Sequence, residues 1–411
     1  MPNVVKWAIL ATLIGVVVGA STAFFLNVLG LGSRMMAGQP YYFLVLPLAF
    51  LASWLVVSRW APQYDGHGTE KIVESINRGN GEAPLVPGIV KLCATVITIA
   101  SGGSAGKEDA GAQIGAAAAS IIADLSSFSD SDRRMIAICG ISAGFAAVFG
   151  APLAGAVFGV EIAAVGGMFY LALLPAVISG VVGYNISLIL GTAYPSYPAA
   201  VPQMFGAVPL LEAVGAGLFF GVVAFILIET LNCCRRLFEV HAVPKAAKVL
   251  LGGAAVALIG LFSTAYLGLG TIDSVLQGGG VAPYSSLLKI LATSITLNFG
   301  GSGGIVTPIF FIGSTAGSLY AQALGLNLAT YAEIGLVGVL AAAANAPIAA
   351  IILSIELFGP AIAPSATIAC VVSFMIVGRR SVYPSQLTAK PPEARGAVEG
   401  KVRQLLHLDD N

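Results

Sequence analysis

Three adjacent charged residues, Lys107, Glu108 and Asp109, interrupt a stretch of small and apolar side chains, "ITIASGGSAGKEDAGAQIGAAAAS". If this stretch lies in a lipid bilayer, a charge near its centre costs roughly 2.5–3.5 kcal/mol on insertion scales. An ionisable residue kept at such a position is therefore a candidate functional group. The alternative is an interfacial loop in which the three side chains reach water.

The composition of the chain places it in a membrane. The 411 residues are 57% hydrophobic and only 10% charged, with a mean hydropathy of +0.90, whereas soluble domains carry about 25% charged residues. Apolar runs such as 4–29 and 209–231 exceed the roughly 20 residues that a membrane-spanning helix requires. We therefore predict an all-α polytopic membrane protein whose partner is the lipid bilayer. The zero net charge offers no basic surface for nucleic acid.

Apolar segments divide the chain into two similar series of predicted helices around a polar link at 193–206. Helices are expected over 4–29, 41–57, 86–105, 109–124, 134–149, 152–166 and 168–191, and over 209–238, 245–268, 284–298, 308–325, 330–345, 347–358 and 363–378. We predict one transmembrane domain over 1–378, with halves at about 1–205 and 206–378, and a short polar tail over 379–411. The excess of basic over acidic residues in that tail favours a cytoplasmic C-terminus.

The two halves contain an internal repeat. "GGSAGKEDAGAQIG" (102–115) aligns with "GGSGGIVTPIFFIG" (300–313), 198 positions later. Two further pairs of blocks keep the same order: "GHGTEKIVESI" (66–76) with "GLGTIDSVLQG" (268–278), and "APLAGAVFGVEI" (151–162) with "APIAAIILSIEL" (346–357). Repeats with short, glycine-interrupted helices at corresponding positions predict a transporter-like fold whose site lies near the membrane midplane. The repeats are inverted if each half crosses the membrane an odd number of times.

Broken helices offer a way to bind an anion without a buried cation. The first turn of a helix has unpaired N–H groups and carries roughly half a positive charge, so that it attracts anions. Glycine clusters at 66–68, 102–106 and 300–304 each precede a helical pattern. Glu108 opens one of these helices and could itself occupy an anion position. A carboxylate there competes with a permeating anion and leaves when protonated, which would make Glu108 a gate and a proton carrier.

The same residues resemble motifs of the CLC family of chloride channels and proton-coupled chloride antiporters. The family pattern Gly-Lys/Arg-Glu-Gly-Pro matches residues 106–110, and Gly-x-Phe-x-Pro matches 304–308. The segment "AAVFGAPLAGAVFGVEI" (146–162) is similar to the family's Ala-Pro-Leu-Ala-Gly helix with its trailing glutamate. Gly66-His67-Gly68 stands where the family has Gly-Ser-Gly, and "RRSVYPSQL" places Tyr383 at its inner-gate tyrosine. The resemblance extends over roughly 60–390.

This resemblance implies a homodimer with one pore per subunit, each built from two inverted halves with broken helices that meet at the membrane midplane. Glu108 would be the extracellular gate. The amides of Ile305 and Val306, with the hydroxyl of Tyr383, would hold a central anion, and His67 would complete the inner coordination. Such neutral donors bind an anion strongly enough to admit it and weakly enough to release it.

The sequence departs from the family pattern at several gate and site positions. His67 replaces serine, and an imidazole donates one hydrogen bond when neutral and two when protonated, so that a different anion is an open alternative; a backbone amide could also bind while His67 turns aside. Asp109 replaces glycine and Ala110 replaces proline beside the gate, next to Gly106 and Lys107. A second carboxylate could raise the pKa of Glu108 by repulsion if it does not point to water.

One further departure concerns proton transfer. Many exchangers of the family have a second glutamate directly after the one that matches Glu161, and this chain has Ile162 there. Glu161 and its repeat counterpart Glu356 are expected to be structural, capping or bridging backbone. The missing glutamate leaves two alternatives, a proton-coupled exchanger and a passive anion channel.

The predicted function is membrane transport of chloride or a related anion, coupled to protons through Glu108. No cofactor, metal ligand or catalytic residue is expected, only the transported anion and protons. A membrane-embedded enzyme is disfavoured because neither HExxH nor paired intramembrane aspartates with a Gly-x-Gly-Asp motif occur. A transporter of cations or neutral solutes is a further alternative. A prokaryotic inner membrane is the expected location.

Overall fold

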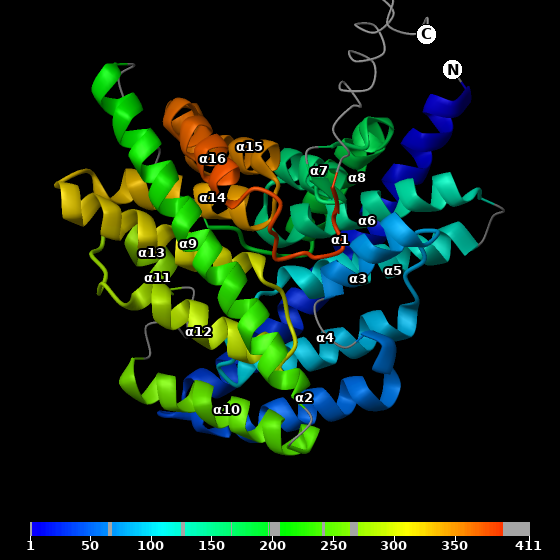
Figure 1. Cartoon of the computed structure of the whole chain (residues 1–411). Coiled ribbons are helices and arrows are strands. Elements are labelled where there is room, and N and C mark those ends of the chain that lie inside the picture. The colour runs from blue at the N-terminus through cyan, green and yellow to red at the C-terminus, as the bar shows by residue number, and fades with distance from the viewer. Residues whose placement is uncertain are drawn as a thin grey trace, which may run out of the picture.

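The computed structural model describes residues 2–64, 68–124, 128–165, 167–195, 197, 206–240, 243–263 and 270–388. Within these residues the chain is helical almost throughout (Figure 1). The helices of the first half are α1 (Pro2–Ala37), α2 (Leu46–Trp60), α3 (Gly68–Arg78), α4 (Leu85–Ala100), α5 (Glu108–Asp124), α6 (Asp130–Phe149), α7 (Pro152–Glu161) and α8 (Leu173–Ile189). Those of the second half are α9 (Ala207–Glu239), α10 (Lys245–Phe262), α11 (Gly270–Leu276), α12 (Ser285–Asn298), α13 (Val306–Leu324), α14 (Leu328–Ala343), α15 (Pro347–Phe358) and α16 (Ala363–Val377).

Long apolar helices occupy the same positions in the two halves. In the described part of the chain, six helical spans are long and apolar enough to cross a membrane. They are Val4–Met36, Tyr42–Trp60 and Tyr170–Ile189 in the first half, and Ala207–Glu239, Lys245–Phe262 and Pro360–Val377 in the second. The short helices between them are the broken elements that the glycine clusters predicted. The predicted all-α membrane fold with two inverted repeats is confirmed.

Several predicted helix ends were wrong. The helix predicted over 152–166 ends at Glu161, because Ala164–Val165 (β1) pairs in parallel with Leu387–Thr388 (β2). The helix predicted over 86–105 ends at Ala100, since Gly102 adopts a left-handed φ of 92° that a right-handed helix does not contain. The helices α3 and α11 follow glycine clusters but were not among the predicted ranges.

The two repeats meet at a pair of glycines. Gly106 N donates to Gly304 O at 2.7 Å, and Gly304 N donates to Gly106 O at 2.8 Å. Upstream of this bridge, Gly102 and Gly300 have nearly equal φ values of 92° and 93°. The loops before α5 and α13 therefore begin with the same conformation and are hydrogen-bonded to each other, although Gly303 has a φ of 146° and its counterpart Ala105 has no positive φ.

Hydroxyl groups extend this junction symmetrically. Ser104 N donates to Thr296 Oγ1 at 3.2 Å, and Ser302 N donates to Thr98 Oγ1 at 2.9 Å. Both threonines lie in the helix that precedes the loop of the opposite half. The loops satisfy their buried amides through these side chains, as irregular backbone inside a membrane protein must.

Close helix packing supports each half of the junction. A Cβ atom added to Gly115 in α5 would lie 2.5 Å from Gly140 O in α6. At the corresponding place in the second half, a Cβ atom on Gly313 in α13 would lie 2.4 Å from Gly335 O in α14. Small residues allow such backbone contact between membrane helices. The start of α5 and the start of α13 are thus held by equivalent helix pairs.

Two glutamates connect the halves by reciprocal capping. The carboxylate of Glu161, at the end of α7, accepts hydrogen bonds from the amides of Ile348 at 3.1 Å and Ala349 at 2.8 Å, in the first turn of α15. Glu356, in α15, accepts hydrogen bonds from the amides of Leu153–Ala154 in the first turn of α7, at 2.9 and 2.7 Å. The helix that each glutamate caps is the one that carries the other glutamate. Glu356 has the backbone-capping geometry that was predicted for it, and Glu161, which was expected to be structural, has the same geometry.

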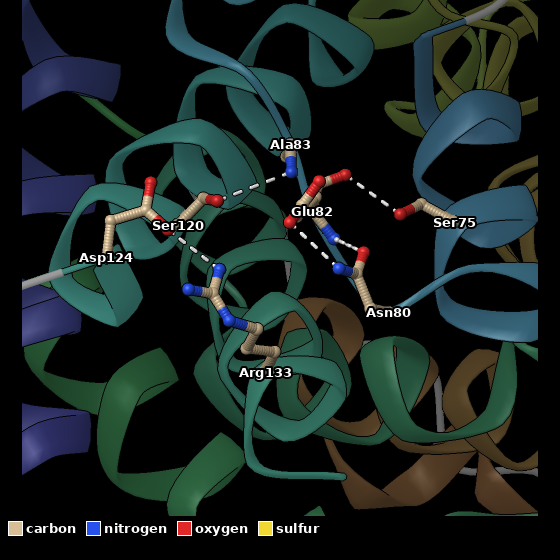
Figure 2. A network of polar contacts seen from close by, with 7 residues as sticks. All are labelled: Ser75, Asn80, Glu82, Ala83, Ser120, Asp124 and Arg133. Carbon is tan, nitrogen blue, oxygen red and sulfur yellow. Dashed lines mark hydrogen bonds and ion pairs between the residues drawn. The ribbon is translucent and has the colours of Figure 1, made fainter. Parts of the chain in front are cut away.

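The loop after α3 is fixed against α5, as Figure 2 shows. Ser75 Oγ donates to Glu82 O at 2.8 Å, and Asn80 Nδ2 donates to Glu82 Oε1 at 2.8 Å. The next amide, Ala83 N, donates to Ser120 Oγ in α5 at 3.4 Å. These contacts tie the C-terminal end of α3 to the helix that begins with Glu108.

Candidate functional site

The carboxylate of Glu108 lies on the N-terminal end of α13. Its Oε1 atom accepts a hydrogen bond from Val306 N at 2.5 Å, and its Oε2 atom accepts one from Thr307 Oγ1 at 2.7 Å. Glu108 is only 3% exposed. The first residue of α5 thus provides an anion to the amide end of α13, where unpaired N–H groups and the helix dipole favour negative charge. Glu108 does not reach water, which contradicts the interfacial-loop alternative.

The glycine bridge allows this close approach. A Cβ atom on Gly304 would lie 2.0 Å from Glu108 Oε1, and one on Gly106 would lie 2.1 Å from Glu108 Oε2. Any larger residue at either position would push the carboxylate out of its place. The glycines noted in the sequence therefore shape the pocket that holds the Glu108 side chain.

Asp109 binds a different helix from the one that Glu108 binds. Its carboxylate accepts hydrogen bonds from Gly68 N at 2.5 Å and from Thr69 N, the first two residues of α3. The side chain is 3% exposed. Two consecutive carboxylates at the start of α5 therefore occupy the amide ends of two separate helices, α13 and α3.

Tyr383 is buried beside these carboxylates. It is 2% exposed, and its phenol interacts electrostatically with Glu108, Asp109 and Glu70. Ile305 directly precedes α13 and is 2% exposed. The structure therefore brings together the predicted residues from α5, α13 and the segment after α16. The predicted inner ligand His67 lies outside the described residues.

Two cavities adjoin this cluster. One, of about 470 Å³, is lined in part by Lys107 and by Thr307, whose hydroxyl binds Glu108. The other, of about 250 Å³, is lined in part by Glu70 and by Val382 and Pro384, the two neighbours of Tyr383. Glu108 is thus hydrogen-bonded to a residue that lines the first cavity. Tyr383 is adjacent in sequence to two residues that line the second cavity.

The other residues that flank the predicted gate have distinct surroundings. The ammonium group of Lys107 interacts electrostatically with Glu108, and this residue lines the larger cavity. Ala110 is 2% exposed and packs with Phe25 and Ile114 in an apolar cluster. Ala110 thus contributes packing, whereas Lys107 provides a positive charge at the edge of the site.

Sequence reasoning missed two polar residues at the site, Thr307 and Glu70. Thr307 stands 198 positions after Asp109, so the repeat alignment could have identified it as a residue of the opposite helix end. Glu70 follows the Gly66–Gly68 cluster and accepts hydrogen bonds from Ser385 N at 2.8 Å and Ser385 Oγ at 2.5 Å. Glu70 could have been identified from the sequence, because it is an acidic residue in the first turn of a helix at a predicted anion site.

No carboxylate replaces the inner glutamate on α7. Ile162 is fully buried directly after that helix. Both carboxylate oxygens of the neighbouring Glu161 accept backbone hydrogen bonds from α15. Helix α7 therefore carries no carboxylate that is free of backbone hydrogen bonds.

The fold and the site define a class of protein. Two inverted halves with broken helices that meet inside the membrane are typical of membrane transporters, and two adjacent carboxylates of α5 lie here on the N-termini of α13 and α3. The family model described as "Voltage gated chloride channel" matches residues 48–378. The chain belongs to this family of CLC proteins.

Relatives and solved structures agree with this assignment. The chain is 35% identical over 398 residues to the chloride/fluoride channel protein of Pseudomonas syringae pv. tomato, covering 94% of this chain and 87% of the relative. It is 30% identical to the voltage-gated ClC-type chloride channel ClcB of Escherichia coli, covering 93% and 98%. The crystal structure of a CLC-type fluoride/proton antiporter is similar with a TM-score of 0.87 and 27% identity, covering 94% and 98%. The chain is accordingly a CLC-type membrane anion-transport protein with bacterial relatives.

Proposed function

We propose that the protein exchanges a small monovalent anion, chloride or fluoride, for protons, and that Glu108 is both its gate and its proton carrier. The observation that carries this proposal is the Glu108 carboxylate on the amide of Val306 and the hydroxyl of Thr307. A side chain that fills the anion-attracting end of a helix blocks any anion that would bind there. Its hydrogen-bond partner Thr307 lines one cavity, and the two neighbours of Tyr383 line another, so that the carboxylate can move from the helix end into adjoining space.

Protonation supplies the switch in this mechanism. A protonated Glu108 loses the charge that the amide end of α13 attracts, and one of its oxygens becomes an O–H donor, which weakens its acceptance of hydrogen bonds from Val306 N and Thr307 Oγ1. The neutral side chain then leaves for the cavity lined by Thr307, and an anion takes its place at the amides of Ile305 and Val306. The hydroxyl of Tyr383 provides a further neutral donor. Deprotonation returns the carboxylate and expels the anion, so that the two movements are coupled.

We name both chloride and fluoride as candidate substrates because the names of the relatives give different anions. One is named a chloride/fluoride channel, another a chloride channel, and a similar structure is a fluoride/proton antiporter. The chain itself has Val306 where the family motif has phenylalanine, and His67 where it has serine. We propose that these two positions set the preference between the anions.

A passive anion channel is the second candidate function. Ile162, which stands in place of the inner glutamate and is fully buried, favours it, because a proton that leaves Glu108 finds no carboxylate at position 162 to accept it. In that case Glu108 would open and close the path without net proton movement.

The assembly and location are also proposals. Family resemblance supports a homodimer in a prokaryotic inner membrane, with residues 1–378 forming the transmembrane domain and 379–411 a cytoplasmic tail. Residues 389–411 of that tail lie outside the described residues.

Purified protein in lipid vesicles tests the proposal. Vesicles loaded with chloride or fluoride are diluted into medium without that anion, and an ion-selective electrode and a pH electrode record the two fluxes. We expect efflux of at least one anion, with proton uptake against an imposed pH gradient. Glu108→Gln should retain anion flux and lose proton uptake, because glutamine cannot ionise.

An exposed residue provides the matched control. Glu239→Gln, at the end of α9, should behave as the unmodified protein does. Anion flux without proton uptake in the unmodified protein would establish the passive channel instead. Absence of both chloride and fluoride flux would overturn the assignment of an anion substrate.

A further inference from the structure

The amide end of α3 is filled by a side chain, as that of α13 is. Asp109 accepts hydrogen bonds from Gly68 N and Thr69 N and is 3% exposed. The helix has eleven residues, Gly68–Arg78, and its C-terminal loop is tied to α5 (Figure 2). The carboxylate therefore lies at the positive end of a helix whose place relative to α5 is fixed.

Glycine at position 68 permits this arrangement. A Cβ atom there would lie 2.7 Å from Asp109 Oδ2 and 2.3 Å from Gln113 Cδ. The backbone of α3 is thus in direct contact with two polar side chains of α5, one turn apart. No apolar group separates the amides of α3 from the Asp109 carboxylate.

Gln113 provides a second, independent indication of a ligand position. Its side chain is 4% exposed, packs on Gly68, and its Oε1 atom has no hydrogen-bond partner among the described residues. Buried polar atoms are almost always paired, so this oxygen marks a place where a hydrogen-bond donor is absent in the present arrangement. A water that accompanies an anion would supply it.

We propose that Asp109 is a second tethered carboxylate in the anion path, which competes with a small monovalent anion for the amides of Gly68 and Thr69. This inference rests on the proposed transport function and extends it to a second helix end. An anion that passes the cluster then has to displace two carboxylates, Glu108 from α13 and Asp109 from α3. The sequence pattern of the family has glycine at the position of Asp109, so the second carboxylate is a property of this chain.

Tethering explains why the carboxylate prevails over a free anion. A group held on the same chain competes at an effective concentration of the order of mM or higher, without any loss of affinity from dilution. Asp109 also adds negative charge close to Glu108, Glu70 and the Tyr383 phenol, and this charge repels a further anion. Removal of the carboxylate should therefore expose an anion site that is occupied in the unmodified protein.

Anion binding to the purified full-length protein tests this inference. Isothermal titration with sodium chloride and sodium fluoride is compared for the unmodified protein and Asp109→Ser, which keeps a short hydroxyl acceptor for the α3 amides. We expect the apparent Kd of the transported anion to fall by about tenfold or more in the variant. Asp109→Asn, which retains the shape and loses the charge, should shift the Kd in the same direction by a smaller factor.

Asp124→Ser is the matched control, because Asp124 ends the same helix and its side chain is 63% exposed. It should bind the anion as the unmodified protein does. An unchanged Kd in both Asp109 variants would overturn the inference. If Asp109→Ser does not fold, the Kd of Asp109→Asn alone tests the inference. If the unmodified protein transports chloride or fluoride in vesicles while the Kd is unchanged, only this inference fails. If it transports neither anion, the proposed function fails.

Discussion

Carboxylates lie on helix N-termini in two regions of this protein. In one region both halves of the repeat contribute a carboxylate, and in the other region only one half does. Between α7 and α15 the arrangement is reciprocal: Glu161 caps α15 and Glu356 caps α7. Between α5 and α13 the arrangement is not reciprocal, and we call this the one-way region. Glu108 caps α13, but the residue 198 positions later, Val306, carries no carboxylate that could cap α5.

The difference between the two regions distinguishes carboxylates that stabilise the fold from a carboxylate that is a candidate gate. In the reciprocal region, each carboxylate accepts two backbone hydrogen bonds at 2.7–3.1 Å from the opposite half, so neither can leave without exposing unpaired amides. In the one-way region the helix end can accept an anion in place of Glu108, and the pairing of the glycine bridge stays intact. We propose that the same chemical interaction stabilises the fold where it is symmetric and acts as a gate where it is not.

The largest expected effect concerns the reciprocal region. Glu161→Ala removes a carboxylate that accepts two amide hydrogen bonds, each typically worth about 1.5–3 kcal/mol to a charged acceptor. We expect the free energy of unfolding to fall by about 3 kcal/mol, visible as a lower midpoint of thermal unfolding in detergent. Glu161→Gln should lose less, because its amide oxygen still accepts hydrogen bonds.

The control for this prediction is an exposed glutamate of the same protein. Glu229 forms an ion pair with Arg380 at 3.2 Å, and their side chains are 44% and 56% exposed. Glu229→Ala should change the unfolding free energy by about 0–1 kcal/mol. Equal midpoints for the Glu161 and Glu229 variants would contradict a structural role for reciprocal capping.

A smaller effect is expected at the one-way helix end. Thr307→Val removes the hydroxyl that donates to Glu108 Oε2 at 2.7 Å, which weakens the hold on the carboxylate by about 1.5 kcal/mol. Because a tenfold change in an equilibrium corresponds to about 1.4 kcal/mol, the transported anion should bind roughly tenfold more tightly. Thr307→Ser keeps the hydroxyl and should bind as the unmodified protein does. Calorimetry that shows the valine variant unchanged would refute this contribution.

The smallest effect tests the symmetry of the junction itself. Thr98→Val and Thr296→Val each remove the acceptor of one loop amide, Ser302 N or Ser104 N. Each should lower the free energy of unfolding by about 1 kcal/mol, and the two losses should be similar. Thermal unfolding in detergent that shows a large loss for one variant and none for the other would mean that the halves are not equally supported.

The sequence predicted the repeat and the gate candidate for clear physical reasons. A charged triplet within small apolar residues is costly in a membrane, which singled out Glu108. Blocks at nearly constant offset predicted two halves, and the structure shows the same φ at Gly102 and Gly300. The reciprocal contacts of Glu161 and Glu356 agree with the structural role that was expected of both.

Contacts between distant segments could not be predicted in the same way. The partner of Asp109 is the start of α3, forty residues earlier, and no local pattern encodes that packing. The early end of α7 depends on a strand pair between β1 and β2, more than 220 residues apart. The helix α11 has only seven residues, too few to show the periodicity from which helices are predicted.

The central claim is that Glu108 moves with protons, whereas Glu161 and Glu356 stay in place. The most direct test measures proton uptake driven by an outward anion gradient in vesicles that contain Glu108→Gln, Glu161→Gln or Glu356→Gln. The account predicts that Glu108→Gln abolishes proton uptake while anion flux continues, and that both other variants, once shown to be folded, remain coupled. Retained proton uptake in Glu108→Gln, or its loss in a folded Glu161→Gln or Glu356→Gln protein, would contradict the account.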